Sequence, residues 1–293
     1  MVENGGIMKK KKSSSAILGD LYGDIRKYQR IMKESAIYLA KKYPNKNLKT
    51  IFSTMPTKMI TIAPMVLCDS TAKDIGVKCS DEILKALGMS MLWISTHDDV
   101  VDEMPRDRNY LSSLVYSGDI GLMEGMRILF AENKKKVADE LINSINENHF
   151  RQQIVIEELW RKRKRKLNRK QYLNGIDHIR TFVSIGPRCA LAFADKLNFK
   201  EKIMKFSRGY GIGIQILDDI REYKEDRKFG YTSLPSIEGP PFRKSFEILY
   251  DNIKIAKKSL GEEWVTLSLY VNKLEDIVLK TCKDMGCNMY GKK

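Results

Sequence analysis

Apolar residues recur at intervals of three and four along nearly every long stretch of the chain, which places them on one face of an α-helix. Alternating apolar and polar runs bounded by Asn-Gly or Asp-Gly turns, which indicate β-hairpins, are missing. The pattern predicts an almost all-α fold. The helices are expected at about 18–43, 57–72, 80–103, 110–131, 134–160, 169–195, 199–225 and, with breaks, 242–290.

Proline and glycine mostly separate these segments, since proline ends or bends a helix and glycine permits turns. Pro44 and Pro56 bracket an expected early loop, Pro105 is expected to end the third helix, and Gly239-Pro240-Pro241 marks a late break. The sequence contains neither an internal repeat nor a linker long enough to separate two domains. We therefore expect a flexible basic N-terminal tail over residues 1–17 and a single domain over residues 18–293.

The composition is typical of a soluble globular protein. Of the 293 residues, 43% are hydrophobic and 30% are charged, and no apolar run approaches the roughly 18 residues that cross a bilayer. The basic opening MVENGGIMKKKKSSS is not followed by the apolar segment of a secretory signal. The odd number of cysteines and the absence of pairs at zinc-site or redox-site spacing predict buried thiols in a reducing compartment. We therefore expect a cytoplasmic protein. The cysteines are Cys68, Cys79, Cys189, Cys282 and Cys287.

The net charge of +15 suits three classes of partner, namely nucleic acid, anionic lipid and phosphorylated substrates. The densest basic run is Arg161–Lys166, which is either a solvated helix end or a peripheral contact to an anionic surface such as a membrane or a polyphosphate. No aromatic residues are interleaved in the run, and no helix-turn-helix, zinc-finger or RNA-binding signature accompanies it. Nucleic acid is therefore not expected as a partner.

Two short segments concentrate acidic residues in this basic chain. In the first, HDDVVDE, Asp98 and Asp102 lie one helical turn apart with Asp99 beside them. Like charges at this spacing destabilise a helix by about 0.2–0.5 kcal/mol per pair. The apolar run LGMSMLWIS before the acids indicates that they lie at the end of a buried helix. A divalent cation is the natural partner for carboxylates at such a position.

The second acidic segment repeats this arrangement about 120 residues later. Asp218 and Asp219 follow an apolar run, and Glu222 lies one turn further on. All candidate ligands are oxygens, and His97, the one nearby imidazole, is interpreted as a hydrogen-bonded neighbour, so Mg²⁺ is favoured over zinc. Mg²⁺ usually shares its coordination with substrate phosphates. Two acidic segments that face each other across the bundle would therefore hold a diphosphate through metal ions.

The two segments together resemble the aspartate-rich motifs of the trans-isoprenyl diphosphate synthases, a family of class I isoprenoid synthases. The resemblance implies the all-α isoprenoid synthase fold, a single bundle of about ten or more helices around a deep central cavity. HDDVVDE is similar to the family's first motif, and IQILDDIRE to its second, with Glu222 in place of the last aspartate. SGDIGLMEGMRIL resembles a Gly-Asp segment between the motifs, with Gly118 and Asp119 in register. The resemblance covers roughly residues 50–240 and identifies the chain as a divergent member.

The resemblance implies a role for each matching residue. The metal ligands, which also make the acidic catalytic set, would be Asp98, Asp99, Asp102, Asp218, Asp219 and Glu222. The residues that contact the substrate diphosphate would be Lys58, Arg106, Arg108, Arg180, Thr181, Gln215 and Lys228. It further implies three Mg²⁺ ions bound with the diphosphate, an allylic prenyl diphosphate as substrate and a homodimer.

Departures from the family pattern concern the second substrate. Chain-elongating members carry a Gly-Gly-Lys-Arg type segment for isopentenyl diphosphate, whereas STMPTKMITIAP here keeps only Lys58. The arginine pair after the first motif is interrupted, because Arg106 and Arg108 flank Asp107. The expected reaction is Mg²⁺-dependent condensation of an allylic diphosphate with isopentenyl diphosphate. The alternatives are cyclisation of a single prenyl diphosphate, as in terpene synthases, and head-to-head condensation of the squalene and phytoene synthase type.

Overall fold

The computed structural model describes residues 20–102, 108–155, 167–229, 232–240 and 242–287; residues 101–102, 108, 152–155 and 229 are described by their backbone alone. Within these ranges every regular element is a helix, as the apolar spacing predicts. The α-helices are α2 (Arg26–Lys42), α3 (Lys46–Ser53), α4 (Met59–Asp74), α5 (Asp81–Asp102), α6 (Arg108–Ala131), α7 (Lys135–Val155), α8 (Arg169–Gly175), α9 (His178–Phe193), α10 (Lys200–Phe229), α11 (Leu234–Glu238), α12 (Arg243–Ser259) and α13 (Val265–Asp284). Short 3-10 helices lie at Met55–Thr57 and Leu197–Phe199.

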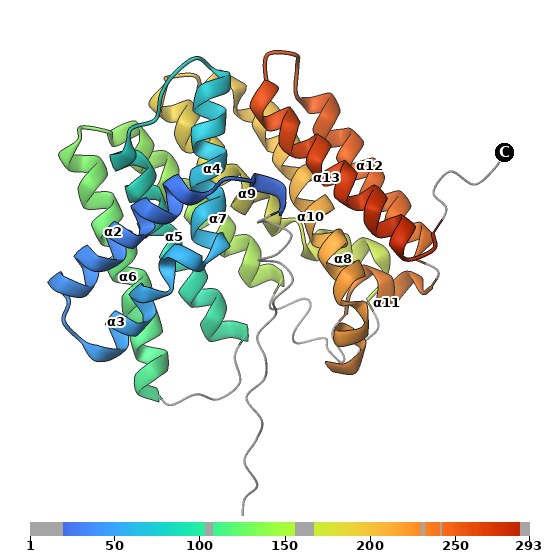
Figure 1. Cartoon of the computed structure of the whole chain (residues 1–293), viewed down its shortest axis with the longest axis horizontal. Helices are drawn as coiled ribbons and strands as arrows, with labels where there is room; N and C mark the ends of the chain where they lie inside the picture. The colour runs from blue at the N-terminus through green and yellow to red at the C-terminus, as the bar shows by residue number, and fades with distance from the viewer. Residues whose placement is uncertain (1–19, 103–107, 156–166, 230–231, 241, 288–293) are drawn as a thin grey trace, which may run out of the picture.

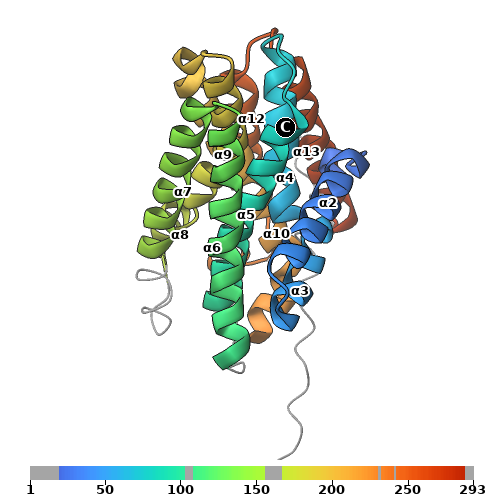
Figure 2. The ribbon, with the colours of Figure 1, turned by 90° about the vertical axis from the view of Figure 1, so that its left-hand side faces the viewer.

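The long helices form a bundle in which α4, α5, α6, α7, α9 and α10 run roughly along one axis (Figures 1 and 2). Helix α5 packs against α6 on one side and α4 on the other, α4 packs against α9, and α9 packs against both α7 and α10. The hairpin of α12 and α13 covers α10 at one edge, and α2 and α3 lie at the opposite edge (Figure 1). Helices α4, α9 and α10 therefore form the interior of the bundle.

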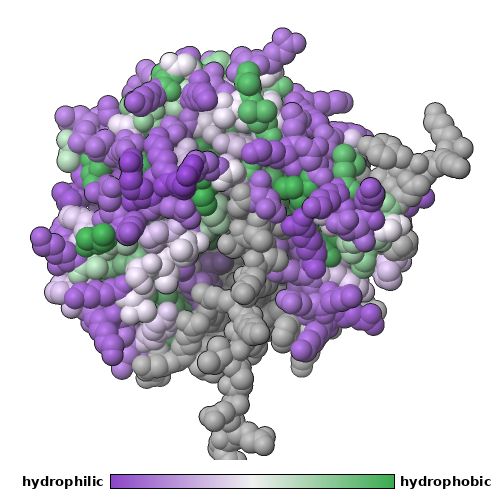
Figure 3. Space-filling model, viewed as in Figure 1, coloured by the Kyte–Doolittle hydropathy of each residue, from purple (hydrophilic) through white to green (hydrophobic). Residues whose placement is uncertain are grey.

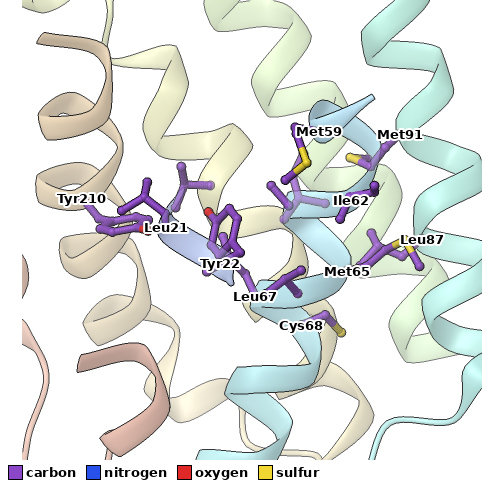
Figure 4. Packing of buried hydrophobic residues seen from close by; sticks show 14 of the residues in the cluster. Leu21, Tyr22, Met59, Ile62, Met65, Leu67, Cys68, Leu87, Met91 and Tyr210 are labelled. Carbon is purple, nitrogen blue, oxygen red and sulfur yellow. The ribbon is translucent and has the colours of Figure 1, made fainter. Parts of the chain in front are cut away.

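One apolar cluster fills the space between these helices and extends from Leu21 to Cys282. Its central part is drawn in Figure 4, where Leu21 and Tyr22 insert between Tyr210 of α10 and Leu67 of α4. Fully burying an apolar side chain of this size stabilises a fold by about 1.5–3 kcal/mol. The segment before α2 is thereby fastened to the middle of the bundle. Whether residues 1–17 form a separate tail stays a prediction, because they lie outside the described residues.

The predicted helices differ from the observed ones at several ends. The expected loop between Pro44 and Pro56 contains α3, because the Asn45 side chain accepts hydrogen bonds from the backbone N–H groups of Asn47 and Leu48 and caps the helix. The first predicted helix is interrupted at Gly23, whose φ of +65° belongs to the left-handed region that favours glycine. The segment 169–195 divides into α8 and α9, and α8 begins with a capping box between Asn168 and Gln171.

The described thiols agree with the expectation of reduced cysteines. All five are free, and four of them are buried. The fold nevertheless brings the sulfur atoms of Cys68 and Cys79 within 3.6 Å of each other. Spacing along the chain gives no indication of this contact, because Cys68 lies on α4 and Cys79 lies in the turn before α5.

The face of the molecule drawn in Figure 3 is predominantly hydrophilic where its residues are described, with scattered hydrophobic residues. Within the described ranges no single helix is long and apolar enough to cross a membrane; one pair bent by 47°, Lys46–Thr57 with Met59–Asp74, reaches that length and composition only when joined. The basic run Arg161–Lys166 lies outside the described residues, so its contact with an anionic surface stays a prediction. The cytoplasmic location likewise stays a prediction.

Candidate active site

The first acidic motif lies on the last turns of α5. Asp99 Oδ2 forms an ion pair with Lys58 Nζ at 2.6 Å, and Lys58 also donates a hydrogen bond to Ser95 Oγ at 2.9 Å. The side chains of Lys58 and Asp99 are 17% and 21% exposed, so the pair is largely shielded from water. Lys58 directly precedes α4, and the ion pair therefore joins the beginning of α4 to the end of α5. A single positive charge already offsets part of the repulsion within the motif.

The residues before the first motif fix the position of α5 against its neighbours. His97 Nδ1 lies 2.8 Å from the Trp93 carbonyl oxygen, which supports its interpretation as a hydrogen-bonded neighbour. Trp93 Nε1 donates to Asp119 Oδ1 on α6 at 3.1 Å. A Cβ atom at Gly118 would lie 2.3 Å from Thr96 Oγ1, so glycine is needed for this close approach of α6 to α5. The Gly118-Asp119 pair thus positions the helix that carries the acids.

The second acidic motif lies on the C-terminal part of α10. Asp218, Asp219 and Glu222 are all buried, and so is Asp226, one turn beyond Glu222. The sequence interpretation missed Asp226, although its four-residue spacing from Glu222 is the signal that identifies it as part of the same helix face. Four buried acids on two turns of one helix are far outside the usual distribution of charged residues, which favour the surface unless paired.

Asp219 is held by three hydrogen bonds from its own chain. Gln215 Nε2 donates to Oδ1 at 2.9 Å, the Leu234 backbone N–H donates to Oδ2 at 3.0 Å, and the Tyr172 hydroxyl also donates to Oδ2. Burial raises the pKa of Asp219 to about 7, because the low-dielectric interior disfavours the carboxylate more than these hydrogen bonds favour it. Asp219 therefore has a clear structural role in addition to the metal-binding role expected from its motif.

The predicted diphosphate pair Arg180-Thr181 begins α9. Arg180 Nη2 lies 3.4 Å from Asp177 Oδ2, and the buried Arg180 Nε has no hydrogen-bond partner. Thr181 donates to the His178 carbonyl oxygen at 2.5 Å and lies 3.2 Å from Asn148 Oδ1. The Thr181 hydroxyl thus bonds back to its own helix, as threonines in helices often do. Arg180 retains an unsatisfied donor that suits an anion.

Sequence reasoning did not assign Arg188, which is among the most buried charged residues of the chain. Its guanidinium donates to Glu140 and, at 2.8 Å, to Glu147 Oε2, and Lys200 Nζ lies 2.9 Å from Glu140 Oε1. Breaking such a buried pair by removing one partner leaves an uncompensated charge. Arg188 therefore joins α9 to α7 and helps to fix the helix that carries Arg180.

Several predicted site residues lie beyond what the structure describes. Arg106 lies outside the described residues, and only the backbone is described for Asp102, at the end of α5, and Arg108, at the beginning of α6. Lys228 is exposed near the end of α10. The assignments of these four residues remain predictions.

The two motifs lie at the same end of the bundle. Helices α5 and α10 both finish toward the lower end in Figures 1 and 2, where α4 begins. Tyr172, on α8, contacts Asp219, and α9 begins at His178 directly after α8, so the start of α9 lies near this end. The acids of α5, the acids of α10, Lys58 and Arg180 thus come from four helices and gather at one end of the fold.

The donor set fits a hard divalent cation, because every candidate ligand is a carboxylate oxygen and His97 Nδ1 is engaged with the Trp93 carbonyl oxygen. Among the side chains that the structure describes, no group of three or more acidic, histidine or cysteine residues converges on one point. The Lys58 ammonium on Asp99 occupies the place of a cation at the first motif. A Mg²⁺ ion held by Asp98, Asp99, Asp218 or Glu222 would therefore complete its ligands with water and substrate oxygens.

No family model matches the chain, and no curated protein does. Solved structures do match over most of its length. A geranylgeranyl pyrophosphate synthetase from the archaeon Geoglobus acetivorans aligns with 92% of this chain and 99% of its own, at 16% identity and a TM-score of 0.64. A geranyltranstransferase from Thermotoga maritima aligns with 87% of this chain and 98% of its own, at 13% identity and a TM-score of 0.64. A geranyltransferase from Legionella pneumophila aligns with 90% of this chain and 99% of its own, at 16% identity and a TM-score of 0.61.

These matches confirm at the level of the fold the resemblance that the two acidic motifs indicate. The identities are low, yet the aligned region includes nearly the whole of each solved chain. The protein has the all-α isoprenoid synthase fold of the trans-prenyl diphosphate synthases.

Proposed function

We propose that this protein is a Mg²⁺-dependent trans-prenyltransferase that ionises an allylic prenyl diphosphate and condenses it with isopentenyl diphosphate. One observation carries the proposal. Buried or half-buried acids on α5 and α10 gather at the same end of a fold shared with a geranylgeranyl pyrophosphate synthetase and a geranyltranstransferase. Burying several carboxylates close together is costly, and the positive charge of a metal–diphosphate complex would offset part of that cost.

The difficult step is heterolysis of the allylic carbon–oxygen bond, which leaves a carbocation and a diphosphate. The metal would neutralise the negative charge that develops on the leaving diphosphate. The chain's own cationic side chains would add to this stabilisation. Among the described ones Arg180 is the strongest candidate, because its buried Nε–H has no hydrogen-bond acceptor and is available to an anion. Arg106, Arg108 and Lys228 are assigned the same role by their motif positions.

The chain must also protect the carbocation from water. The acids of α10 follow the buried residues Ile216 and Leu217, and those of α5 follow Met91, Leu92 and Ile94, which are also buried. These apolar residues before each motif would exclude water from the carbocation. Exclusion of water would also strengthen the electrostatic interactions between the acids, the metal and the diphosphate. Ile94 and the half-buried Trp93 occupy the positions that limit the product length in the family the motifs resemble, which favours a short product.

Cyclisation of a single prenyl diphosphate is the second candidate. Lys58, the one retained cation of the segment that would bind isopentenyl diphosphate, is engaged with Asp99. The altered arginine pair around Asp107 favours the same alternative. A head-to-head condensation of two prenyl diphosphates is a third outcome of the same assay.

The test is incubation of the full chain with geranyl, farnesyl or geranylgeranyl diphosphate and Mg²⁺, with and without isopentenyl diphosphate. A longer diphosphate that forms only with isopentenyl diphosphate supports the proposal. A hydrocarbon or alcohol from one allylic substrate alone replaces elongation by cyclisation, and a product of twice the chain length indicates head-to-head condensation. No turnover of any allylic diphosphate overturns all three.

We further propose a homodimer that forms through α6. Tyr116, Met123 and Phe130 recur at seven-residue intervals on this helix and are 63%, 71% and 53% exposed. Seven residues are close to two full helical turns, so the three side chains form one apolar stripe. A large apolar stripe on a helix surface favours a protein partner, and a second copy with the same stripe would be self-complementary.

A further inference from the structure

Lys58 contacts two residues near the end of α5. Its ammonium lies 2.6 Å from Asp99 Oδ2 and 2.9 Å from Ser95 Oγ, and both partners belong to α5. Ser95 is buried, and Lys58 and Asp99 are both less than one quarter exposed. An ion pair in such surroundings is much less screened than one at the surface.

We propose, on the basis of the prenyl diphosphate chemistry proposed above, that Lys58 is the resident counter-ion of the first acidic motif. It opposes the binding of a divalent cation until a diphosphate arrives and draws Lys58 away from Asp99. Metal and diphosphate then bind the motif together, and the protein without substrate binds metal there only weakly.

Simple electrostatics supports this exchange. A Mg²⁺ ion bonded to Asp99 at about 2.1 Å would lie only a few ångströms from an ammonium that is hydrogen-bonded to the same carboxylate. Two cations at that separation repel, and the partly buried site screens the repulsion poorly. The metal therefore binds favourably only when the ammonium moves away or an anion enters between the two charges.

The chemistry of lysine suits the movement that this requires. Its charge is carried on a flexible stem of four carbons, so Nζ can change partner without a change in the backbone. Lys58 is also the N-cap residue of α4, and its extended backbone places it where the positive end of the helix dipole favours an anion. A diphosphate near this helix end would attract the ammonium away from Asp99, and the positive charge would stay in the site.

The test is the binding of Mn²⁺, a paramagnetic substitute for Mg²⁺ with similar oxygen ligands, to the full chain without any diphosphate. Titration followed by electron paramagnetic resonance measures the dissociation constant. Lys58→Gln is expected to bind Mn²⁺ about tenfold more tightly than the wild type, which corresponds to about 1.4 kcal/mol. Lys58→Arg keeps the charge and is expected to bind like the wild type.

Two controls separate this effect from a general change of charge or fold. Lys136, on α7, forms an exposed ion pair with Asp195. Lys136→Gln removes the same charge as Lys58→Gln and should leave the affinity for Mn²⁺ within about twofold of the wild type. In an Asp99→Asn background, Lys58→Gln should produce no gain, because the ion pair is already absent. Circular dichroism establishes that each variant is folded.

A second arm adds inorganic pyrophosphate. Pyrophosphate should tighten Mn²⁺ binding more in the wild type than in Lys58→Gln, because only the wild type has a counter-ion to release. Equal or weaker Mn²⁺ binding by Lys58→Gln, or no binding at all, overturns the inference. Because Mn²⁺ binding is measured without a prenyl substrate, its result is independent of the product assay. If Lys58→Gln binds Mn²⁺ more tightly but the protein transfers no prenyl group, the proposed function is rejected while the role of Lys58 as counter-ion is supported.

Discussion

The hydroxyl of Tyr172, on α8, donates a hydrogen bond to Asp219 Oδ2, on α10. The same oxygen accepts a hydrogen bond from the backbone N–H of Leu234, which begins α11. One carboxylate of the second acidic motif therefore joins three helices that are separated along the chain. The bond from Leu234 joins the beginning of α11 to α10.

Removal of the Tyr172 hydroxyl should destabilise the fold. In Tyr172→Phe the ring stays in its buried place while a buried hydrogen bond to a carboxylate is lost, so the free energy of unfolding should fall by about 1–3 kcal/mol. Urea denaturation followed by circular dichroism measures the change. Tyr116→Phe is the matched control, because it removes a hydroxyl from a side chain that is exposed in the single chain and keeps the apolar ring of the α6 stripe; it should change stability by less than about 0.5 kcal/mol. Equal stability of the two variants would show that the bond between Tyr172 and Asp219 does not support the fold.

The buried carboxylate of Glu124 should make stability depend on pH. Burial acts to raise its pKa, but hydrogen bonds from Lys42, Tyr43, Tyr38 and Arg127 outweigh this and lower the pKa from 4.5 to about 2. Because the folded state holds the proton less tightly than the unfolded state, the stabilisation is complete above pH 4.5 and is lost as the pH falls toward 2.

Glu124→Gln removes this contribution. At pH 7 the variant should be less stable than the wild type by about 1–3 kcal/mol, since hydrogen bonds to a charged group are lost. The difference should shrink between pH 4.5 and pH 2, where the wild-type carboxylate becomes protonated. Urea denaturation at pH 7 and pH 3 measures both values. A difference that is the same at the two pH values would contradict the assigned role of the charge.

Arg188 should be essential for the packing of α9 on α7. Arg188→Met removes the guanidinium that lies between Glu140 and Glu147, and the loss of one partner of a buried ion pair costs about 3–5 kcal/mol. Thermal unfolding measures the effect. Adding Glu140→Gln to Arg188→Met should recover part of the loss, because a buried negative charge is removed. If Arg188→Met alone is as stable as the wild type, the network has no structural role.

The apolar stripe on α6 should control assembly. Met123→Glu places a charge in the middle of the stripe between Tyr116 and Phe130 and should convert a dimer into a monomer. Sedimentation velocity at several protein concentrations measures the change. Ile255→Glu, at an exposed apolar position on α12, is the control and should leave the mass unchanged. A wild-type protein that is monomeric at all concentrations would contradict the proposed dimer.

The periodic pattern was sufficient to predict the fold class and most of the long helices, because an amphipathic helix repeats its apolar positions over several turns. Short elements could not be predicted in this way. Helix α3 depends on the Asn45 cap, and the Gly23 break depends on one left-handed residue within an apparently continuous pattern. Such features are decided by single residues and tertiary packing, to which a periodicity over many residues is insensitive.

Residue type and spacing were sufficient to propose the acids of both motifs and Arg180 as site residues, because those features carry the chemistry. Partners far apart in the sequence were not predictable, since Lys58 meets Asp99 and Tyr172 meets Asp219 only through the packing of separate helices. Asp226 could have been found from its spacing to Glu222. The role of Arg188 required knowledge of its burial between two glutamates.

The acids of α5 and α10 are proposed to act on one prenyl diphosphate, and this is tested by the turnover of farnesyl diphosphate with isopentenyl diphosphate and Mg²⁺. The variants are Asp98→Asn, Asp218→Asn and the double variant, each checked for folding by circular dichroism. Each single variant should lose at least about a hundredfold in kcat/KM, and the double variant should be little worse than the poorer single one, since residues that act as a unit are not additive. Wild-type turnover in either single variant, or product formation by the wild type without a divalent cation, would contradict the proposed site.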